Sequence, residues 1–314
     1  MSQLSLFATF DPPVVLRKDV ISEAWGYLLR NMTSQLNQSN ELCVYDLKLW
    51  DEGNNQNSFL APSSQVAETL AHLYLTSELG TSDDILSMVM GGEIRDLIVP
   101  PGGLDEDVEK VIKSKKRFRH TLSEHLAFWS RLATAVQFNT GKFACSLSNV
   151  QPEDKGPDGL FVSIDSDTKV EIQSVKSSIN NPQGRISTKS FRTSGRIPPN
   201  SKRKLLEDFH RFAFSNFGFT RLERQLVELF RLLDVPTDRK LRIALLSNTK
   251  CSYNAVVVAN HQYACIELFE GYQFVTSDVQ RRIATYIGSV DWSEIAEQTR
   301  VSVIRTLKRL GFLT

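Results

Sequence analysis

The chain has 314 residues, of which 41% are hydrophobic and 23% charged, so it can bury a full core. Its 37 Lys and Arg residues nearly balance 36 Asp and Glu residues, so the global charge indicates no nucleic-acid partner, and any such partner must be met by local basic patches. The four cysteines form no C-x-x-C pair, which excludes a zinc site of that type, and no apolar run is long enough to cross a membrane. We therefore expect a soluble, cytoplasmic protein with buried thiols.

Residues 1–13 read as an extended, flexible tail without the basic and apolar stretches of a signal peptide. The tail contains the pentapeptide QLSLF, which resembles the motif that bacterial polymerases and repair factors use to bind the replicative sliding clamp. The resemblance implies that Leu6 and Phe7 enter an apolar pocket of the clamp, with Gln3 at its rim and Leu4 nearby. The alternative is a first strand that packs these apolar side chains onto the domain.

The next region, residues 14–104, is predicted to be helical or α/β. Apolar spacing predicts helices over residues 14–33 and 63–79 and another starting near Ser82, whereas alternation over residues 42–49 predicts a strand. A PPGG run at residues 100–103 is a strong break.

A long, charged helical pattern follows, from Asp105 to about Phe138. It is either one helix or two helices broken near His120 and Thr121, since residues 121–124 resemble a capping box. The basic run KSKKRFRH at residues 113–120 fits either a solvated helix face or a contact with nucleic acid.

Two alternating apolar runs, GLFVSID and KVEIQSVKSS, predict a β-hairpin after a short strand at residues 142–148. Alternation places Glu171 and Gln173 on one face of the second strand, and antiparallel pairing is expected to bring Asp158 beside Glu171. Converging carboxylates are ligands that Mg²⁺ prefers, and a nearby lysine or amide can stabilise charge on a phosphate. The hairpin therefore predicts a site for metal-dependent phosphodiester hydrolysis.

Pro157-Asp158, Glu171-Ile172-Gln173 and Lys176 together resemble the PD-(D/E)xK nuclease superfamily, over roughly residues 118–247. The resemblance implies an α/β fold: a restriction-endonuclease-like mixed sheet flanked by helices in the order αβββαβ, here with helical N- and C-terminal additions. It also implies that Asp158 and Glu171 hold Mg²⁺, or Mn²⁺ in its place, and that Glu124 assists from the first helix.

The sequence departs from that superfamily pattern at the lysine, which should lie two residues after the acid, where Gln173 stands. Either Gln173 takes the lysine's role, or a β-bulge at Ser174-Val175 brings Lys176 onto the face that carries the site.

The loop at residues 180–204 is rich in basic residues and contains no acidic ones. It is either an ordinary solvated loop or a clamp that binds DNA phosphates through Arg185, Lys189, Arg192 and Arg196. An amphipathic helix is predicted from Ser201 to about Leu233, and a buried strand over residues 241–246.

The C-terminal region, residues 251–314, is predicted to be mostly helical. Residues 291–314 resemble a helix-turn-helix with its turn at Arg300, and the alternative is a pair of packed terminal helices. The chain contains no H-E-x-x-H, G-x-S-x-G or P-loop motif, so any ATP-driven work on DNA needs a separate ATPase or helicase subunit.

These patterns predict a nuclease core over residues 105–250 that hydrolyses DNA with Mg²⁺. The expected role is an endonuclease in bacterial anti-phage defence, restriction or DNA repair, recruited by the sliding clamp. The alternative is a nuclease-fold adaptor that binds DNA or the clamp and cuts nothing.

Overall fold

The computed structural model of the chain describes residues 13–38, 42–48, 63–99, 103–147, 158–164, 168–180, 228–234, 250–264 and 281–313. The predictions for residues 1–12, for the basic loop at 180–204 and for the strand at 241–246 lie outside the described residues. The helices are α1 (Lys18–Asn31), α2 (Ser63–Leu79), α3 (Ser82–Val89), α4 (Glu106–Lys113), α5 (Lys115–Gln137), the 3₁₀ helix η1 (His261–Tyr263) and α11 (Trp292–Arg309).

The described strands form two sheets. The larger has seven strands in the order β2 (Thr33–Gln38), β3 (Leu42–Lys48), β9 (Arg281–Ser289), β8 (Lys250–Asn260), β7 (Thr168–Ser177), β6 (Gly159–Ile164) and β5 (Lys142–Leu147). The smaller is a ribbon of β1 (Val14–Leu16) and β4 (Leu97–Ile98). The protein is therefore a mixed α/β structure, as the sequence predicts.

The large sheet has a parallel centre and antiparallel edges. Strands β3, β9, β8 and β7 run parallel to their neighbours, whereas β2 pairs antiparallel with β3, and β5, β6 and β7 form an antiparallel meander. The predicted hairpin is confirmed as β6 and β7, with Phe161 opposite Glu171. One sheet thus draws its strands from all three regions that the sequence suggested, residues 14–104, 105–250 and 251–314.

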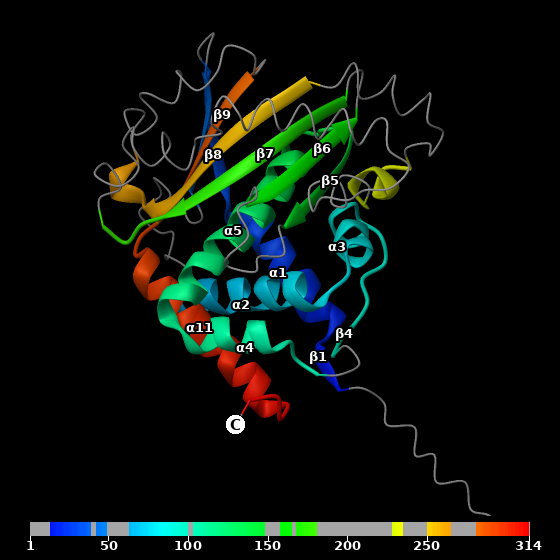
Figure 1. Ribbon diagram of the computed structural model, residues 1–314, viewed down its shortest axis with the longest axis vertical. Coiled ribbons are helices and arrows are strands. Elements are labelled where there is room, and N and C mark those ends of the chain that lie inside the picture. The colour runs from blue at the N-terminus through cyan, green and yellow to red at the C-terminus, as the bar shows by residue number, and fades with distance from the viewer. Residues whose placement is uncertain are drawn as a thin grey trace, which may run out of the picture.

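Helices cover one face of this sheet in two tiers. In Figure 1, α5 crosses directly beneath the strands, and α1, α2, α4 and α11 lie on its far side. Residues of α5 are buried around most of its circumference, including Phe118, Trp129 and Leu132, because it packs between the sheet and the outer helices. The opposite face of the sheet is also buried at Val162, Val170 and other apolar positions, so the central strands are covered on both sides.

Two helix predictions need correction. The helix-turn-helix is wrong, because Trp292–Arg309 forms one continuous helix that starts at the Asp291 cap and carries Arg300 within it. Arg300 donates to the Ile112 carbonyl at 3.2 Å and pairs with Glu297, so it joins α11 to α4. The break proposed at His120 is also wrong: the chain bends at Ser114, whose side chain caps α5.

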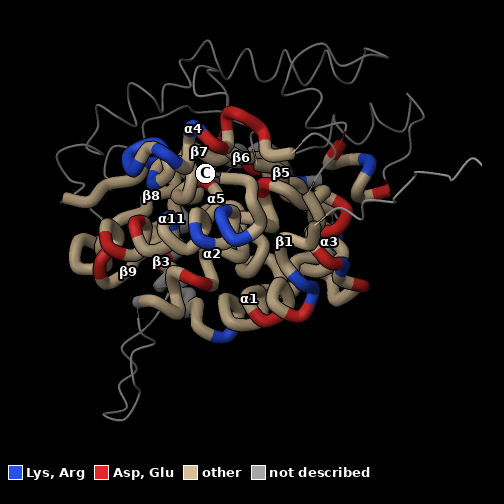
Figure 2. Tube along the Cα trace, turned by 90° about the horizontal axis from the view of Figure 1, so that it is seen from below, with Lys and Arg blue, Asp and Glu red and all other residues tan. Residues whose placement is uncertain are grey.

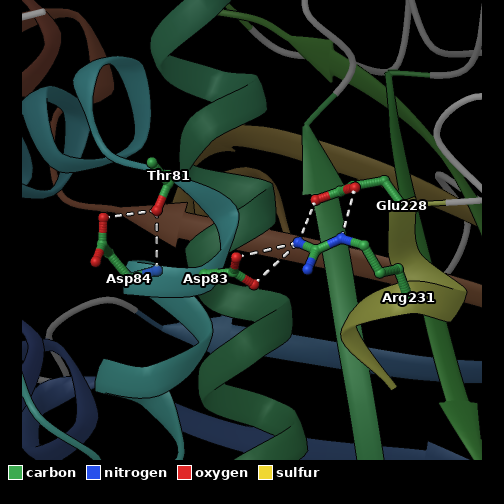
Figure 3. A network of polar contacts seen from close by, with 5 residues as sticks. All are labelled: Thr81, Asp83, Asp84, Glu228 and Arg231. Atoms are coloured by element: carbon green, nitrogen blue, oxygen red, sulfur yellow. Dashed lines mark hydrogen bonds and ion pairs between the residues drawn. The ribbon is translucent and has the colours of Figure 1, made fainter. Parts of the chain in front are cut away.

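An exposed ionic network joins α3 to the helical segment at residues 228–232. The Arg231 guanidinium lies 3.1 Å from Asp83 and 2.8 Å from Glu228, beside the Thr81 cap of α3 (Figure 3). More than half of the Arg231 side chain is exposed, so solvent screens these pairs and they add little to stability. Leu229, Phe230 and Leu233 are buried and anchor the segment.

Charges of both signs are spread over the outer helices (Figure 2), in keeping with the formal net charge of +1. Among the helices that the structure describes, none is long and apolar enough to cross a membrane.

Candidate functional site

Asp158 lies at the end of the β6–β7 pairing, where β6 begins. Its backbone N–H donates to the Gln173 carbonyl at 2.9 Å, and its side-chain Oδ2 accepts a hydrogen bond from the Val175 N–H at 2.6 Å. The Asp158 carboxylate therefore accepts a backbone hydrogen bond from β7 in the way a neighbouring strand would. This bond fixes the position of the carboxylate. Because the register pairs Gly159 with Gln173, Asp158 adjoins the segment around Ser174 and not Glu171. The expectation that Asp158 lies beside Glu171 is wrong.

Glu171 lies on the face of β7 that meets α5, and the residue is 3% exposed. Oε2 accepts from the Arg131 Nε at 3.0 Å, while Oε1 accepts from the amides of Gln173 at 3.1 Å and Asn254 at 2.7 Å. The Arg131 guanidinium also stacks 3.7 Å over the Phe161 ring. Both oxygens of Glu171 accept hydrogen bonds from protein donors, so this buried side chain links the sheet to α5.

The Glu171 network extends across the sheet. The side-chain Oδ1 of Asn254 accepts a hydrogen bond from the Thr285 hydroxyl at 2.9 Å. Hydrogen bonds thus link polar side chains from β7 through β8 to β9. A small cavity lies beneath α5. Its lining includes Arg131, Gln173, Asn254 and Thr285, together with Leu47 and Val256. Gln173 is 2% exposed and its amide nitrogen serves Glu171, so it is positioned for structure and not for contact with substrate.

Lys176 lies on the other side of β7. The β7–β8 pairing keeps an unbroken register from Lys169 to Ser177, so no residue is inserted at Ser174-Val175 and the predicted bulge is absent there. Alternation then places Ser174 and Lys176 together, on the face opposite Glu171 and Gln173. The residue two positions before Lys176, where the nuclease pattern has its acid, is Ser174.

His120 and Glu124 lie one turn apart on α5. The His120 Nε2 lies 3.7 Å from Oε1 of Glu124, one turn further along the helix, and 58% of the His120 side chain is exposed. Partial burial lowers the pKa of His120, the Asp158 carboxylate acts against this shift, and the Lys176 ammonium adds to it. The charges of Asp158 and Lys176 therefore both act on His120, which lies one helical turn from Glu124.

A second polar cluster ties α5 to α2. The Ser77 Oγ lies 2.6 Å from the His125 Nδ1, and the His125 Nε2 lies 2.7 Å from the Glu78 Oε1. Although the residue types match a serine-histidine-acid triad, the Ser77 hydroxyl also contacts the Leu73 carbonyl at 2.9 Å and the Trp129 Nε1 at 3.3 Å. These contacts hold the hydroxyl between two helices, so we assign the cluster a structural role.

The described residues fit a divalent cation only at Asp158. Mg²⁺ is commonly held by one or two carboxylates together with waters and substrate phosphates. Asp158 has its Oδ1 without a hydrogen-bond partner among the described residues, whereas both oxygens of Glu171 are taken. No group of three His, Cys, Asp or Glu side chains in the described part of the chain is arranged to hold a metal. A bound cation would thus depend on Asp158, on waters and on the substrate itself.

Sequence reasoning missed Arg131, Asn254 and His120. Arg131 could have been found from helical spacing, because it follows Glu124 by two turns on the side of α5 that meets the sheet. The predicted DNA-binding residues Arg185, Lys189, Arg192 and Arg196 lie outside the described residues, as do Gln3, Leu4, Leu6 and Phe7.

The chain matches no family model, and a search of curated proteins found no relative of it.

Proposed function

We propose that the protein is a metal-dependent DNA nuclease whose site is centred on Asp158 and Lys176, with Glu124 and His120 beside them. The observation that carries this proposal is that the Asp158 carboxylate and the Lys176 ammonium both act electrostatically on His120, while the Val175 N–H fixes Asp158 where β6 begins. An acid, a lysine and a histidine in one partly exposed location are the groups that phosphodiester hydrolysis uses.

The topology supports the same reading. The described elements follow the order α5, β5, β6, β7 and then β8, with an antiparallel meander and a parallel fourth strand. This order is compatible with the αβββαβ core of the PD-(D/E)xK superfamily, in which the acid and the lysine come from the second and third strands. The assignment to a restriction-endonuclease-like fold is part of the proposal.

The proposed roles differ from those expected from sequence. Asp158 holds the cation and Glu124 assists, while Glu171 is a structural ion pair and Gln173 supports it. When bound, the cation would polarise a phosphate oxygen and activate water. Lys176 stabilises the charge that builds on the phosphate. Partial burial lowers the pKa of His120, which favours the neutral imidazole that can accept a proton from water.

The test is cleavage of plasmid DNA in Mg²⁺ and in Mn²⁺. Asp158→Asn and Lys176→Met should each lower the rate at least about a hundredfold, whereas Asp96→Asn, which removes an exposed carboxylate elsewhere, should leave it unchanged. Circular dichroism should show the same fold for all variants. Full activity in Asp158→Asn would refute the proposed centre.

A non-catalytic adaptor is the second candidate, and one observation favours it: Arg131 neutralises the acid that the nuclease pattern would use. Such a protein would bind DNA with unchanged affinity in wild type and Asp158→Asn, and would cut no substrate with either ion.

Recruitment by a bacterial sliding clamp remains part of the proposal and rests on the QLSLF peptide alone. Deletion of residues 1–9 should abolish retention of the protein on immobilised clamp. Leu6→Ala/Phe7→Ala should lose retention as the deletion does, and Ser5→Ala should keep it. Unchanged retention of the deletion variant would rule out clamp binding through the QLSLF peptide.

A further inference from the structure

The first turns of α5 carry a concentration of positive charge that the rest of the described surface does not neutralise. Lys115 pairs with Glu297 at 3.0 Å, but Lys116, Arg117 and Arg119 have no carboxylate partner among the described residues. The adjoining cations of α4 behave differently, since Lys110 and Lys113 both pair with acids of their own helix. Within the described part of the chain, no carboxylate therefore offsets the charges of Lys116, Arg117 and Arg119.

Two of these cations lie on the side of α5 that carries His120. Lys116, Arg119 and His120 lie three and four residues apart, so they share one side of the helix. The ammonium of Lys116 and the guanidinium of Arg119 both act on His120, as do Asp158 and Lys176. Arg117 is not among the charges that act on His120, which agrees with its different direction from the helix axis. Basic side chains of α5 and of β7 thus act on the same histidine as Asp158.

The local stability of the helix does not explain this charge. Positive side chains in a first turn oppose the helix dipole. Helices α3, α4 and α11 each have acids in their first turns, whereas α5 has none there. The α4–α5 junction, beside the α4 label in Figure 2, accordingly shows adjoining basic residues.

We propose that Lys116 and Arg119, with Lys176, bind consecutive phosphates of a DNA strand and hold the strand against Asp158. The proposal rests on the proposed function, because it takes Asp158 as the reacting centre. Phosphate is the anion class that fits, since a guanidinium binds it through paired hydrogen bonds and a lysine through charge. A row of cations leading to one acid suits a linear polyanion better than a small anion.

The experiment compares two double variants that remove the same charge. Lys116→Gln/Arg119→Gln alters the proposed contacts, and Arg30→Gln/Arg117→Gln is the matched control on α1 and on the other side of α5. Binding of a short fluorescein-labelled duplex, and of the corresponding single strand, is followed by anisotropy in EDTA at several salt concentrations. Thermal melting checks that every variant is folded.

The first variant should bind at least about tenfold more weakly, and the slope of log affinity against log salt should fall by about 2, one phosphate contact for each cation removed. The control should stay within about twofold of wild type. Equal weakening by the two variants, or no weakening by the first, would overturn the assignment.

Because EDTA removes the metal, this result is independent of turnover. If the first variant loses binding while wild type cuts nothing in Mg²⁺, the phosphate contacts stand and the nuclease function fails. If wild type cuts DNA and the first variant binds it normally, the nuclease stands and the phosphate contacts fail.

Discussion

At the residue scale, the ion pair with Arg131 gives Glu171 a structural role, although Glu171 belongs to a sequence pattern typical of catalysis. The Arg131 side chain is 18% exposed, and its guanidinium pairs with Glu171 at 3.0 Å and stacks on Phe161. Removing one partner of a buried pair leaves an uncompensated charge, which costs more than the pair itself contributes.

We predict that Arg131→Met lowers the free energy of unfolding by about 3–5 kcal/mol, because Glu171 is left buried and unpaired. Urea denaturation monitored by tryptophan fluorescence measures the change, with the exposed Arg30→Met as control. Arg131→Met/Glu171→Gln should recover much of the loss, since no charge remains buried. A loss below about 1 kcal/mol for Arg131→Met would mean that solvent reaches the carboxylate.

The same residues show what sequence can and cannot predict about a site. The alternation of β7 correctly separates Glu171 and Gln173 from Lys176, because strand periodicity is local. The expected pairing of Asp158 with Glu171 is wrong, because the alternation of a strand does not fix its register against the neighbouring strand. The partner of Glu171 lies 40 residues away on α5, and only tertiary packing reveals it.

At the element scale, the placement of α5 depends on its contacts with α2 through Ser77, Glu78 and His125. Burial opposes ionisation of Glu78, but the His125 ring and the Tyr74 hydroxyl outweigh it and lower the pKa of that carboxyl. A carboxyl with a lowered pKa stabilises the fold above its ordinary value of 4.5, and this stabilisation is lost as pH falls through the lowered value.

We predict that Glu78→Gln costs roughly 1.5–3 kcal/mol at pH 7, the size of a hydrogen bond to a charged group. The difference from wild type should shrink as pH falls below 4.5, once wild type also loses the charge. Thermal melts between neutral and acidic pH measure both quantities, with the exposed Glu23→Gln as control. A difference that stays constant across this range would show that the charge of Glu78 does not stabilise the fold.

Periodicity predicted several helices and the β6–β7 hairpin, but the 11-residue β8 and the 9-residue β9 lie in the region expected to be mostly helical, and that expectation is wrong. Short strands and helix breaks were also missed. Periodicity placed α2, β3, β5 and the β6–β7 hairpin, since each repeats its pattern over several residues. The strands β1 and β4 have three and two residues, too few for any period to appear. The expected turn at Arg300 failed because a long amphipathic helix has the same apolar spacing as two short ones.

At the scale of the whole molecule, stability is concentrated in the parallel centre of the large sheet. Residues 255–259 of β8 are at most 1% exposed, and the strand is flanked on both edges by β7 and β9. The β1–β4 ribbon has only one partner for each short strand, and isolated ribbons of this kind are marginally stable.

We predict that amide hydrogen exchange separates these two regions. Amides of Val256, Val257 and Val258 should exchange only through global unfolding, so their exchange free energy should equal that from urea denaturation in the same buffer. Amides of Leu16 and Ile98 should exchange several kcal/mol more easily, because the ribbon can open while the large sheet stays intact. Arg131→Met should lower protection in β8 by its full denaturation cost and leave the ribbon unchanged, since local opening does not involve the Glu171 network. Equal protection in both regions would instead mean that the ribbon and the sheet unfold as a single cooperative unit.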